Sequence, residues 1–264
     1  MSSSSFREKY GPWALVAGAS EGIGAAFAHE LAARGLHLVL MARRLAPLEA
    51  LAAELRAAHG VEVRVAPVDL GAPTLLDDVR REVAGLEVGL LVYNAALSLI
   101  GPFLDHPLSD KLRVLDVNCR GPLVLADELG RQMAARGRGG IILMSSLAGT
   151  QGTAYVATYA ATKAFNLVLA EGLWYELRDH GVDVLACRAG ATRTPAFEAS
   201  KPKPGPAPIM DARPVAVEAL DALGKAPSMV PGVLNRAAAF FMQHVMPRKA
   251  AVSTMGASTR KMYR

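Results

Sequence analysis

The stretch Trp13-Ala-Leu-Val-Ala-Gly18-Ala-Ser-Glu-Gly22-Ile-Gly24 decides the fold that this sequence predicts. It begins with an apolar run too short for a helix, and apolar residues then recur at helical spacing from Gly22 to Arg34. A glycine-rich turn that opens a helix binds phosphate, because backbone amides approach the anion and the helix end carries partial positive charge. The predicted phosphate-binding residues are Gly18, Ser20, Gly22, Ile23 and Gly24. A purely structural glycine turn is the alternative.

Short apolar runs and helical patterns alternate beyond this stretch. The predicted strands are Trp13–Ala17, Leu36–Met41, Val61–Ala66, Val88–Tyr93, Ile141–Met144 and Val182–Ala186. The helical patterns are Gly22–Arg34, Leu45–His59, Leu75–Ala84, Leu112–Arg136 and Thr158–Asp179. Repeated βαβ units predict the α/β class, as a doubly wound parallel sheet (Rossmann fold) with helices on both faces. Ligands of such sheets bind at the carboxyl ends of the strands.

The 52% content of apolar residues excludes a disordered chain. A length of 264 residues is usual for a single α/β domain, so we expect one domain spanning residues 1–264. The prolines clustered between Pro195 and Pro214 exclude regular helix or strand there, and we interpret residues 195–214 as a substrate lid. Helices are predicted at Val215–Leu223 and Val233–Met246, followed by a loosely held tail from Ser253. Residues 232–264 are basic, and no acidic residue follows Asp221.

Two arginines follow the second predicted strand. Arg43 and Arg44 stand where an NAD site would have an acid for the ribose 2′-hydroxyl, and no carboxylate lies between Glu30 and Glu49. A guanidinium binds a 2′-phosphate through charge-assisted hydrogen bonds, so the sequence favours NADP(H), with Arg43 the stronger candidate. The alternative is that both arginines begin a solvated helix. Among later strand ends, Asp69 with Leu70 is a candidate adenine contact, and Asn94 is expected to fix the fourth strand near the cofactor.

A second group of polar residues predicts acid/base chemistry. Tyr159 and Lys163 share one helical face, and a neighbouring ammonium favours the phenolate form of a tyrosine. Ser146 follows the fifth strand and is expected to hydrogen-bond a substrate carbonyl that Tyr159 protonates. Asn118 is a candidate link between Lys163 and a water chain, or a helix-bending residue satisfied by backbone. A packed ring beside a solvated amine is the alternative for the tyrosine–lysine pair.

With these motifs in order, the chain resembles the short-chain dehydrogenase/reductase family from about Trp13 to Leu234. The resemblance implies an NAD(P)-dependent oxidoreductase with catalytic residues Asn118, Ser146, Tyr159 and Lys163. Lys163 would lower the pKa of Tyr159 and both would lie at the cofactor ribose, while Gly190, Thr192 and Thr194 in the sixth-strand turn would lie at the nicotinamide. The chain departs from the family pattern in two places: the usual Asn-Asn-Ala-Gly is Tyr93-Asn94-Ala95-Ala96, and the usual Pro-Gly is Ala189-Gly190. These departures affect geometry and leave every reacting group in place.

The expected substrate is a hydrophobic ketone or secondary alcohol of fatty-acyl or steroid type, because apolar residues flank the predicted site. These candidates are Leu97, Phe103, Leu147, Tyr155 and Phe197. The alternative function is a nucleotide-binding regulator or scaffold without significant turnover. In a third interpretation, the basic C-terminal segment contacts an anionic membrane. The alternatives are that this segment closes the substrate pocket or packs on another subunit.

Other features exclude further partners and indicate a compartment. The scattered histidines and the distant Cys119 and Cys187 predict no metal site and a reduced, cytoplasmic protein without disulfides. No nucleic-acid motif, signal peptide or membrane-spanning segment is predicted. The family resemblance implies a homodimer or homotetramer.

Overall fold

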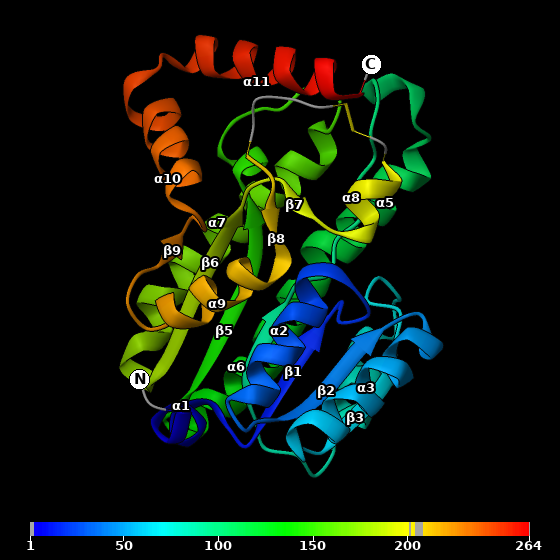
Figure 1. The fold of residues 1–264 in the computed structure, drawn as a ribbon, viewed down its shortest axis with the longest axis vertical. Coiled ribbons are helices and arrows are strands. Elements are labelled where there is room, and N and C mark those ends of the chain that lie inside the picture. The colour runs from blue at the N-terminus through cyan, green and yellow to red at the C-terminus, as the bar shows by residue number, and fades with distance from the viewer. Residues whose placement is uncertain (1–2, 201, 204–207, 264) are drawn as a thin grey trace.

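The computed structural model describes residues 3–200, 202–203 and 208–263. Its centre is a parallel sheet of seven strands in the order β3-β2-β1-β4-β5-β6-β9 (Figure 1). The strands are β1 (Trp13–Ala17), β2 (His37–Ala42), β3 (Val63–Pro67), β4 (Val88–Tyr93), β5 (Gly139–Ser146), β6 (Val182–Ala189) and β9 (Ser228–Met229). The doubly wound α/β fold and the six predicted strands are confirmed, with ends that differ by a few residues. The edge strand β9 was not predicted, since only two residues pair there.

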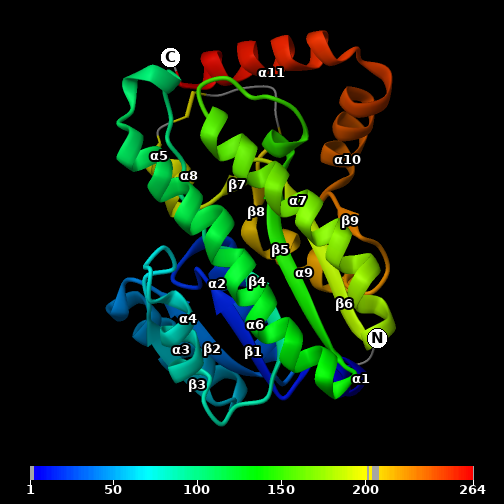
Figure 2. The same ribbon diagram turned by 180° about the vertical axis from the view of Figure 1, so that it is seen from behind.

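Helices cover both faces of the sheet and divide the core into two apolar clusters (Figures 1 and 2). On one face pack α2 (Gly22–Ala33), α3 (Leu45–His59), α9 (Ala212–Ala222) and α1 (Ser3–Tyr10). On the other pack α4 (Leu75–Glu82), α6 (Gly121–Arg136) and α7 (Ala157–Leu177). The strands are buried on both faces, which explains why they appear in the sequence as continuous apolar runs. No helix in the described part of the chain is long and apolar enough to cross a membrane.

The strand order reverses at β1, which pairs with β2 on one side and with β4 on the other. In doubly wound sheets such a switch point is where ligands bind, beside the carboxyl ends of the two central strands. The Asn94 side chain bridges the switch point, because its Nδ2 donates to the carbonyl of Gly18 at 3.0 Å. The side chain of Asn94 therefore joins the end of the fourth strand to the glycine-rich turn.

The predicted helix Leu112–Arg136 is wrong as a single element. The structure has α5 (Leu108–Leu115), a π-helical turn at Asp116–Arg120 and then α6. Pro122 explains part of the break, because it has no N–H to donate to the carbonyl of Asn118 four residues earlier. We call Asp116–Arg120 the π turn.

The prediction that residues 195–214 contain no regular structure is also wrong in part. A short helix, α8 (Pro195–Ala199), begins with a proline at its first position, where the missing N–H costs no hydrogen bond. Two short strands, β7 (Thr192–Arg193) and β8 (Met210–Asp211), pair in parallel, and α9 begins at Ala212. Residues 201 and 204–207 of the predicted lid lie outside the described residues.

The predicted loose tail from Ser253 is wrong for its described residues. The chain continues from α10 (Val233–Phe240) and a second π-helical turn (Phe241–Val245) into a long helix, α11 (Arg248–Tyr263). Figure 1 shows α11, in red, lying across the top of the molecule, beyond the carboxyl ends of the strands. Its residues Ala251 and Thr259 are buried, so tertiary packing holds a helix that the polar composition did not indicate.

Candidate active site

The glycine-rich turn between β1 and α2 is closely packed from behind. Gly18 has a φ of +82°, and a Cβ on it would lie 2.6 Å from the backbone nitrogen of Ala95. A Cβ on Gly24 would lie 2.0 Å from the carbonyl oxygen of Gly18. The N-cap residue of α2, Glu21, makes no side-chain hydrogen bond to the first amides of the helix. The first backbone amides of α2 are therefore free to donate hydrogen bonds to a bound ligand. Together with the glycine-rich turn they suit the pyrophosphate of a dinucleotide.

The two arginines after β2 lie in different surroundings. Arg44 crosses to the glycine-rich turn, where it forms an ion pair with Glu21 and a long hydrogen bond of 3.5 Å to the Ser20 hydroxyl. Arg43 is exposed and makes no hydrogen bond or ion pair within residues 3–200, 202–203 and 208–263. Its charge acts on Asp69 across the strand ends. Of the two guanidiniums, Arg43 has the donors that a 2′-phosphate needs.

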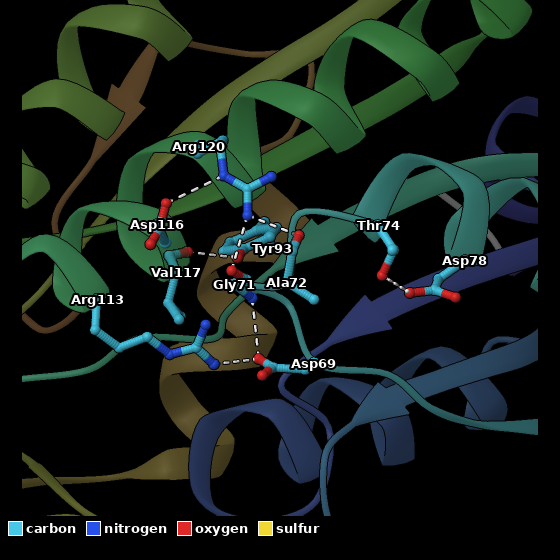
Figure 3. A network of polar contacts seen from close by, with 10 residues as sticks. All are labelled: Asp69, Gly71, Ala72, Thr74, Asp78, Tyr93, Arg113, Asp116, Val117 and Arg120. Atoms are coloured by element: carbon cyan, nitrogen blue, oxygen red, sulfur yellow. Dashed lines mark hydrogen bonds and ion pairs between the residues drawn. The ribbon is translucent and has the colours of Figure 1, made fainter.

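Asp69 lies in the loop after β3 and is held by two donors (Figure 3). Its Oδ1 accepts from the Gly71 amide at 3.1 Å and from the Arg113 guanidinium of α5. Burial acts to raise the pKa of this carboxyl, but these hydrogen bonds and the charges of Arg113 and Arg43 outweigh burial and leave the pKa lowered. Oδ2 accepts no hydrogen bond from the described residues, so it is open to a donor such as an adenine amino group.

Ser146 and Tyr159 meet at the carboxyl end of β5. Ser146 ends the strand, and Tyr159 lies in the first turn of α7. A side-chain hydrogen bond joins the serine to the phenol. Burial raises the pKa of Tyr159, this hydrogen bond opposes the rise, and the phenol of Tyr263 in α11 adds to it. The raised pKa therefore keeps the phenol in its neutral, proton-donating form.

Lys163 lies one helical turn from Tyr159 and is buried, with 3% of its surface exposed. Its Nζ donates to the carbonyl of Met144 on β5 at 2.8 Å and lies 5.5 Å from the centre of the Tyr159 ring. Burial lowers the pKa of Lys163 to about 8. The predicted convergence of Ser146, Tyr159 and Lys163 is present in the structure. A solvated lysine beside a packed ring, the alternative weighed above, does not describe it.

Asn118 is fully buried in the π turn, and within the described residues its side chain hydrogen-bonds Leu97 and Thr162 and not Lys163. Its amide makes three hydrogen bonds: Oδ1 accepts from the Leu97 N–H at 2.8 Å, and Nδ2 donates to the Leu97 carbonyl at 2.8 Å and to Thr162 Oγ1 at 3.0 Å. The side chain therefore anchors the loop after β4. The main-chain carbonyl of Asn118 lacks its usual helical donor, because Pro122 has no N–H. This carbonyl, and not the side chain, is therefore available to a water molecule.

The turn after β6 reaches the glycine-rich turn through Thr194. Thr194 caps α8, because its hydroxyl oxygen accepts a hydrogen bond from the Phe197 amide at 3.1 Å. A Cβ on Gly22 would lie only 2.8 Å from the methyl carbon of Thr194. Thr192 is buried and its hydroxyl donates to the Gly190 carbonyl at 3.1 Å. A Cβ on Gly190 would lie 2.8 Å from Asn235 of α10, so helix packing by itself explains this glycine.

The predicted substrate residues differ in their placement. Leu97 is fixed by Asn118, and the loop that follows it returns to the site where the Gly101 amide donates to the Tyr155 carbonyl at 2.8 Å. Leu147 follows Ser146 directly in the chain. Phe103 is 55% exposed and lies under the Lys111 ammonium, 4.1 Å from Nζ to the ring centre. Phe103 is therefore placed outward against α5.

Helix α11, which the sequence did not predict as a helix, packs against the segment that follows β5. Arg248 donates to the Thr150 carbonyl at 2.9 Å, and a Cβ on Gly256 would contact Ala154 at 3.4 Å. At the other end of α11 the Met262 carbonyl accepts from the Lys203 amide at 2.9 Å. These contacts set α11 against the segment after β5 and against Lys203, and the phenol of Tyr263 at the end of α11 acts on Tyr159.

The sequence matches the short chain dehydrogenase family over residues 12–205, which is more than half of the chain. The protein belongs to the short-chain dehydrogenase/reductase family. This short-chain dehydrogenase/reductase is therefore an oxidoreductase of the ketone/alcohol class that uses a nicotinamide dinucleotide.

Two solved structures and one sequence relative are similar to this short-chain dehydrogenase/reductase. The 7β-hydroxysteroid dehydrogenase of Clostridium sardiniense is 35% identical over 233 residues, covering 88% of this chain and 89% of that protein. A 7β-hydroxysteroid dehydrogenase structure superposes with a TM-score of 0.89 at 32% identity, covering 95% of this chain and 98% of the other. A short-chain dehydrogenase from Sphingobium yanoikuyae in complex with NADPH superposes with a TM-score of 0.78 at 32% identity, covering 87% and 92%.

Proposed function

We propose that this protein is an NADP(H)-dependent oxidoreductase that interconverts a bulky, hydrophobic ketone of steroid type and its secondary alcohol. The observation that carries the proposal is the meeting of the Tyr159 phenol, the Ser146 hydroxyl and the buried Lys163 ammonium at the carboxyl end of β5. The similarity to 7β-hydroxysteroid dehydrogenases supports the steroid class, and the similarity to an NADPH complex supports the cofactor.

The cofactor would lie across the switch point of the sheet. The amides and hydroxyl of the glycine-rich turn would hold the pyrophosphate, Arg43 with Arg44 the 2′-phosphate, and Asp69 with Leu70 the adenine. Asn94, Tyr159 and Lys163 would lie at the ribose, and Gly190, Thr192 and Thr194 at the nicotinamide. The cofactor supplies or accepts the hydride.

The chain's own residues position the carbonyl oxygen and transfer its proton. Ser146 Oγ donates a hydrogen bond to the substrate oxygen, and in the reductive direction Tyr159 gives that oxygen its phenolic proton. A raised pKa keeps Tyr159 protonated for this step. In the oxidative direction Tyr159 must accept the proton, and Lys163 stabilises the phenolate one helical turn away. A water bound at the Asn118 main-chain carbonyl would return a proton to Tyr159 after it has protonated the substrate oxygen.

Apolar side chains near these groups would face the body of the substrate. Leu97, Leu147, Tyr155 and Phe197, all partly buried, would line the substrate region, whereas Phe103 is exposed. A steroid nucleus presents a large apolar surface with few polar groups, which suits such a lining. A fatty-acyl ketone shares this apolar character and is the second substrate to test.

Turnover assays with NADPH and NADH over steroid, fatty-acyl, aromatic and small aliphatic ketones test the proposal. We expect NADPH oxidation to be fastest with a steroid ketone. Replacing Tyr159 by Phe should lower kcat about 1,000-fold, because it removes the proton donor, while leaving NADPH affinity nearly unchanged. A protein that binds NADPH but turns over no ketone is instead a nucleotide-binding regulator.

We also propose that the protein forms a homodimer or homotetramer through α5, α6 and α7, and that it works in the reducing cytoplasm. Exposed large apolar side chains lie on these helices: Leu108, Leu112, Leu115, Leu123, Phe165 and Val168. Burial of such a face in a subunit contact removes apolar area from water. Cys119 and Cys187 are free thiols. Sedimentation velocity of the full chain measures the oligomeric state.

For the C-terminal segment we propose closure of the substrate site by α11, in preference to contact with an anionic membrane. The contact of Arg248 with Thr150, shortly after Ser146, and the influence of the Tyr263 phenol on Tyr159 support closure. Exposed apolar residues on α10 and the turn after it, Val233, Leu234, Phe240, Phe241 and Val245, support the membrane alternative. Sedimentation with anionic liposomes at low and high salt distinguishes them.

A further inference from the structure

The π turn between α5 and α6 leaves two successive carbonyls without their usual partners. In an α-helix the Gly121 amide would donate to Val117 and the residue-122 amide to Asn118. Here the Gly121 amide donates to the Asp116 carbonyl, five residues back, and residue 122 is a proline. A π turn of this kind is uncommon, and a buried carbonyl that loses its helical amide needs a donor from outside the helix.

Tyr93, the last residue of β4, supplies one such group (Figure 3). Its hydroxyl donates to the Val117 carbonyl at 2.5 Å, in place of the helical amide. The phenol has room only because residue 121 is glycine, since a Cβ there would lie 2.1 Å from the Tyr93 oxygen. Burial raises the pKa of Tyr93, so the hydroxyl remains a donor throughout the working pH range.

The π turn is also tied to both halves of the candidate active site. Arg120 donates to the carbonyls of Gly71 and Ala72, at 2.8 and 2.7 Å, in the loop that carries Asp69. On the other side the Asn118 amide holds Leu97 and reaches Thr162, whose hydroxyl donates to the Tyr159 carbonyl at 2.7 Å. The register of the π turn therefore decides where Asn118 lies relative to the start of α7.

We propose that Tyr93 is a positioning residue for catalysis: its hydroxyl holds the π turn in register, and the π turn places Asn118 beside the helix that carries Tyr159 and Lys163. This inference rests on the proposed function. Tyr93 itself touches neither the substrate nor the reacting atoms. Its contribution should appear in kcat and not in cofactor affinity.

The first experiment compares Tyr93→Phe with Tyr10→Phe. Tyr10 is an equally buried tyrosine whose hydroxyl donates to Asp183 at 2.5 Å, at the opposite end of the sheet. Each variant loses one buried phenolic hydrogen bond, so the two should lose similar thermal stability. We expect kcat to fall about 10-fold or more in Tyr93→Phe, because small displacements in a catalytic site are costly, with the KM for NADPH within about 2-fold of wild type. Tyr10→Phe should keep the wild-type kcat.

A crystal structure of Tyr93→Phe is the second measurement, and it does not depend on turnover. The Gly121 amide should move to the Val117 carbonyl and restore α-helical pairing. An unchanged π turn, or a kcat equal to that of Tyr10→Phe, overturns the inference. If the wild-type protein turns over no ketone at all, the proposed function fails, and the crystal structure still decides whether Tyr93 holds the π turn.

A double-mutant comparison tests the same contact through thermal stability and does not depend on turnover. Gly121→Ala places a Cβ against the Tyr93 oxygen and should lower the thermal midpoint. The same substitution should cost less in a Tyr93→Phe background, because the clashing oxygen is gone. Equal costs in the two backgrounds show that the hydroxyl does not set the packing of the π turn, and overturn the inference.

Discussion

Replacing Lys163 by Met should make the cofactor-free protein more stable at neutral pH while abolishing turnover. Lys163 is buried, and its pKa falls from 10.5 to about 8 in the folded protein. A depression of this size corresponds to about 3 kcal/mol of unfavourable free energy for burying the ammonium. The lost hydrogen bond from Nζ to the Met144 carbonyl offsets about 1–2 kcal/mol. The expected net gain of Lys163→Met at pH 7 is therefore about 1–2 kcal/mol.

The pH dependence of the same comparison has a definite sign. Between pH 8 and 10.5 the unfolded chain keeps the Lys163 proton and the folded protein has lost it, so wild-type stability rises with pH through this window. Lys163→Met has no such group. Its advantage over wild type should therefore shrink by about 2 kcal/mol between pH 7 and pH 9.5, and other titrating groups cancel in the difference.

Urea unfolding of both cofactor-free proteins at pH 7, 8.5 and 9.5 measures this difference directly. NADPH must be absent, because a ligand that binds the folded state masks the change. Lys163→Leu is a control for the shape of the methionine side chain and should show the same pH trend. A stability difference that stays constant from pH 7 to pH 9.5 would show that the folded protein does not bury a charged lysine, and would refute the argument.

Two further substitutions test the cofactor site by titration with NADPH and NADH. Arg43→Ala should weaken NADPH binding roughly 10- to 100-fold and leave NADH binding nearly unchanged, since it removes charged hydrogen bonds to the 2′-phosphate. Arg44→Ala should have a smaller effect, because the Arg44 guanidinium is already paired with Glu21. Equal losses of affinity for both nucleotides in Arg43→Ala would contradict the role of Arg43. Gly24→Ala should abolish binding of either nucleotide, because the added Cβ would meet the Gly18 carbonyl. The control Gly172→Ala, at a position in α7 that faces open space, should bind both nucleotides normally. Retained binding in Gly24→Ala would contradict the close packing of the glycine-rich turn.

The strands and the reacting groups were predictable because their signals are local. Each central strand is buried on both faces and therefore forms a continuous apolar run. The glycines of the 18–24 turn and the four-residue spacing of Tyr159 and Lys163 mark positions that few other residue types can fill. These features predicted the doubly wound fold and the pairing of the phenol with the ammonium.

Features that depend on distant packing were not predictable in the same way. The helical pattern from Leu112 to Arg136 gave no sign of the π turn, although Pro122 was visible and Tyr93 stood out against the family's asparagine. The loose tail predicted from Ser253 lies within α11. Its composition is polar, and the helix is stabilised by contacts with residues about 100 positions earlier, such as that of Arg248 with Thr150.

The sequence by itself determined the class of fold, the phosphate-binding turn and the identity of the reacting side chains, because these follow from periodicity and from the chemistry of individual residues. Only the tertiary structure decided what surrounds them: the environment that lowers the pKa of Lys163, the capture of the Asn118 side chain by Leu97, and the hydroxyl of Tyr93 inside a helix break. Burial and hydrogen-bond partners are properties of segments brought together from across the chain, and a linear pattern does not contain them.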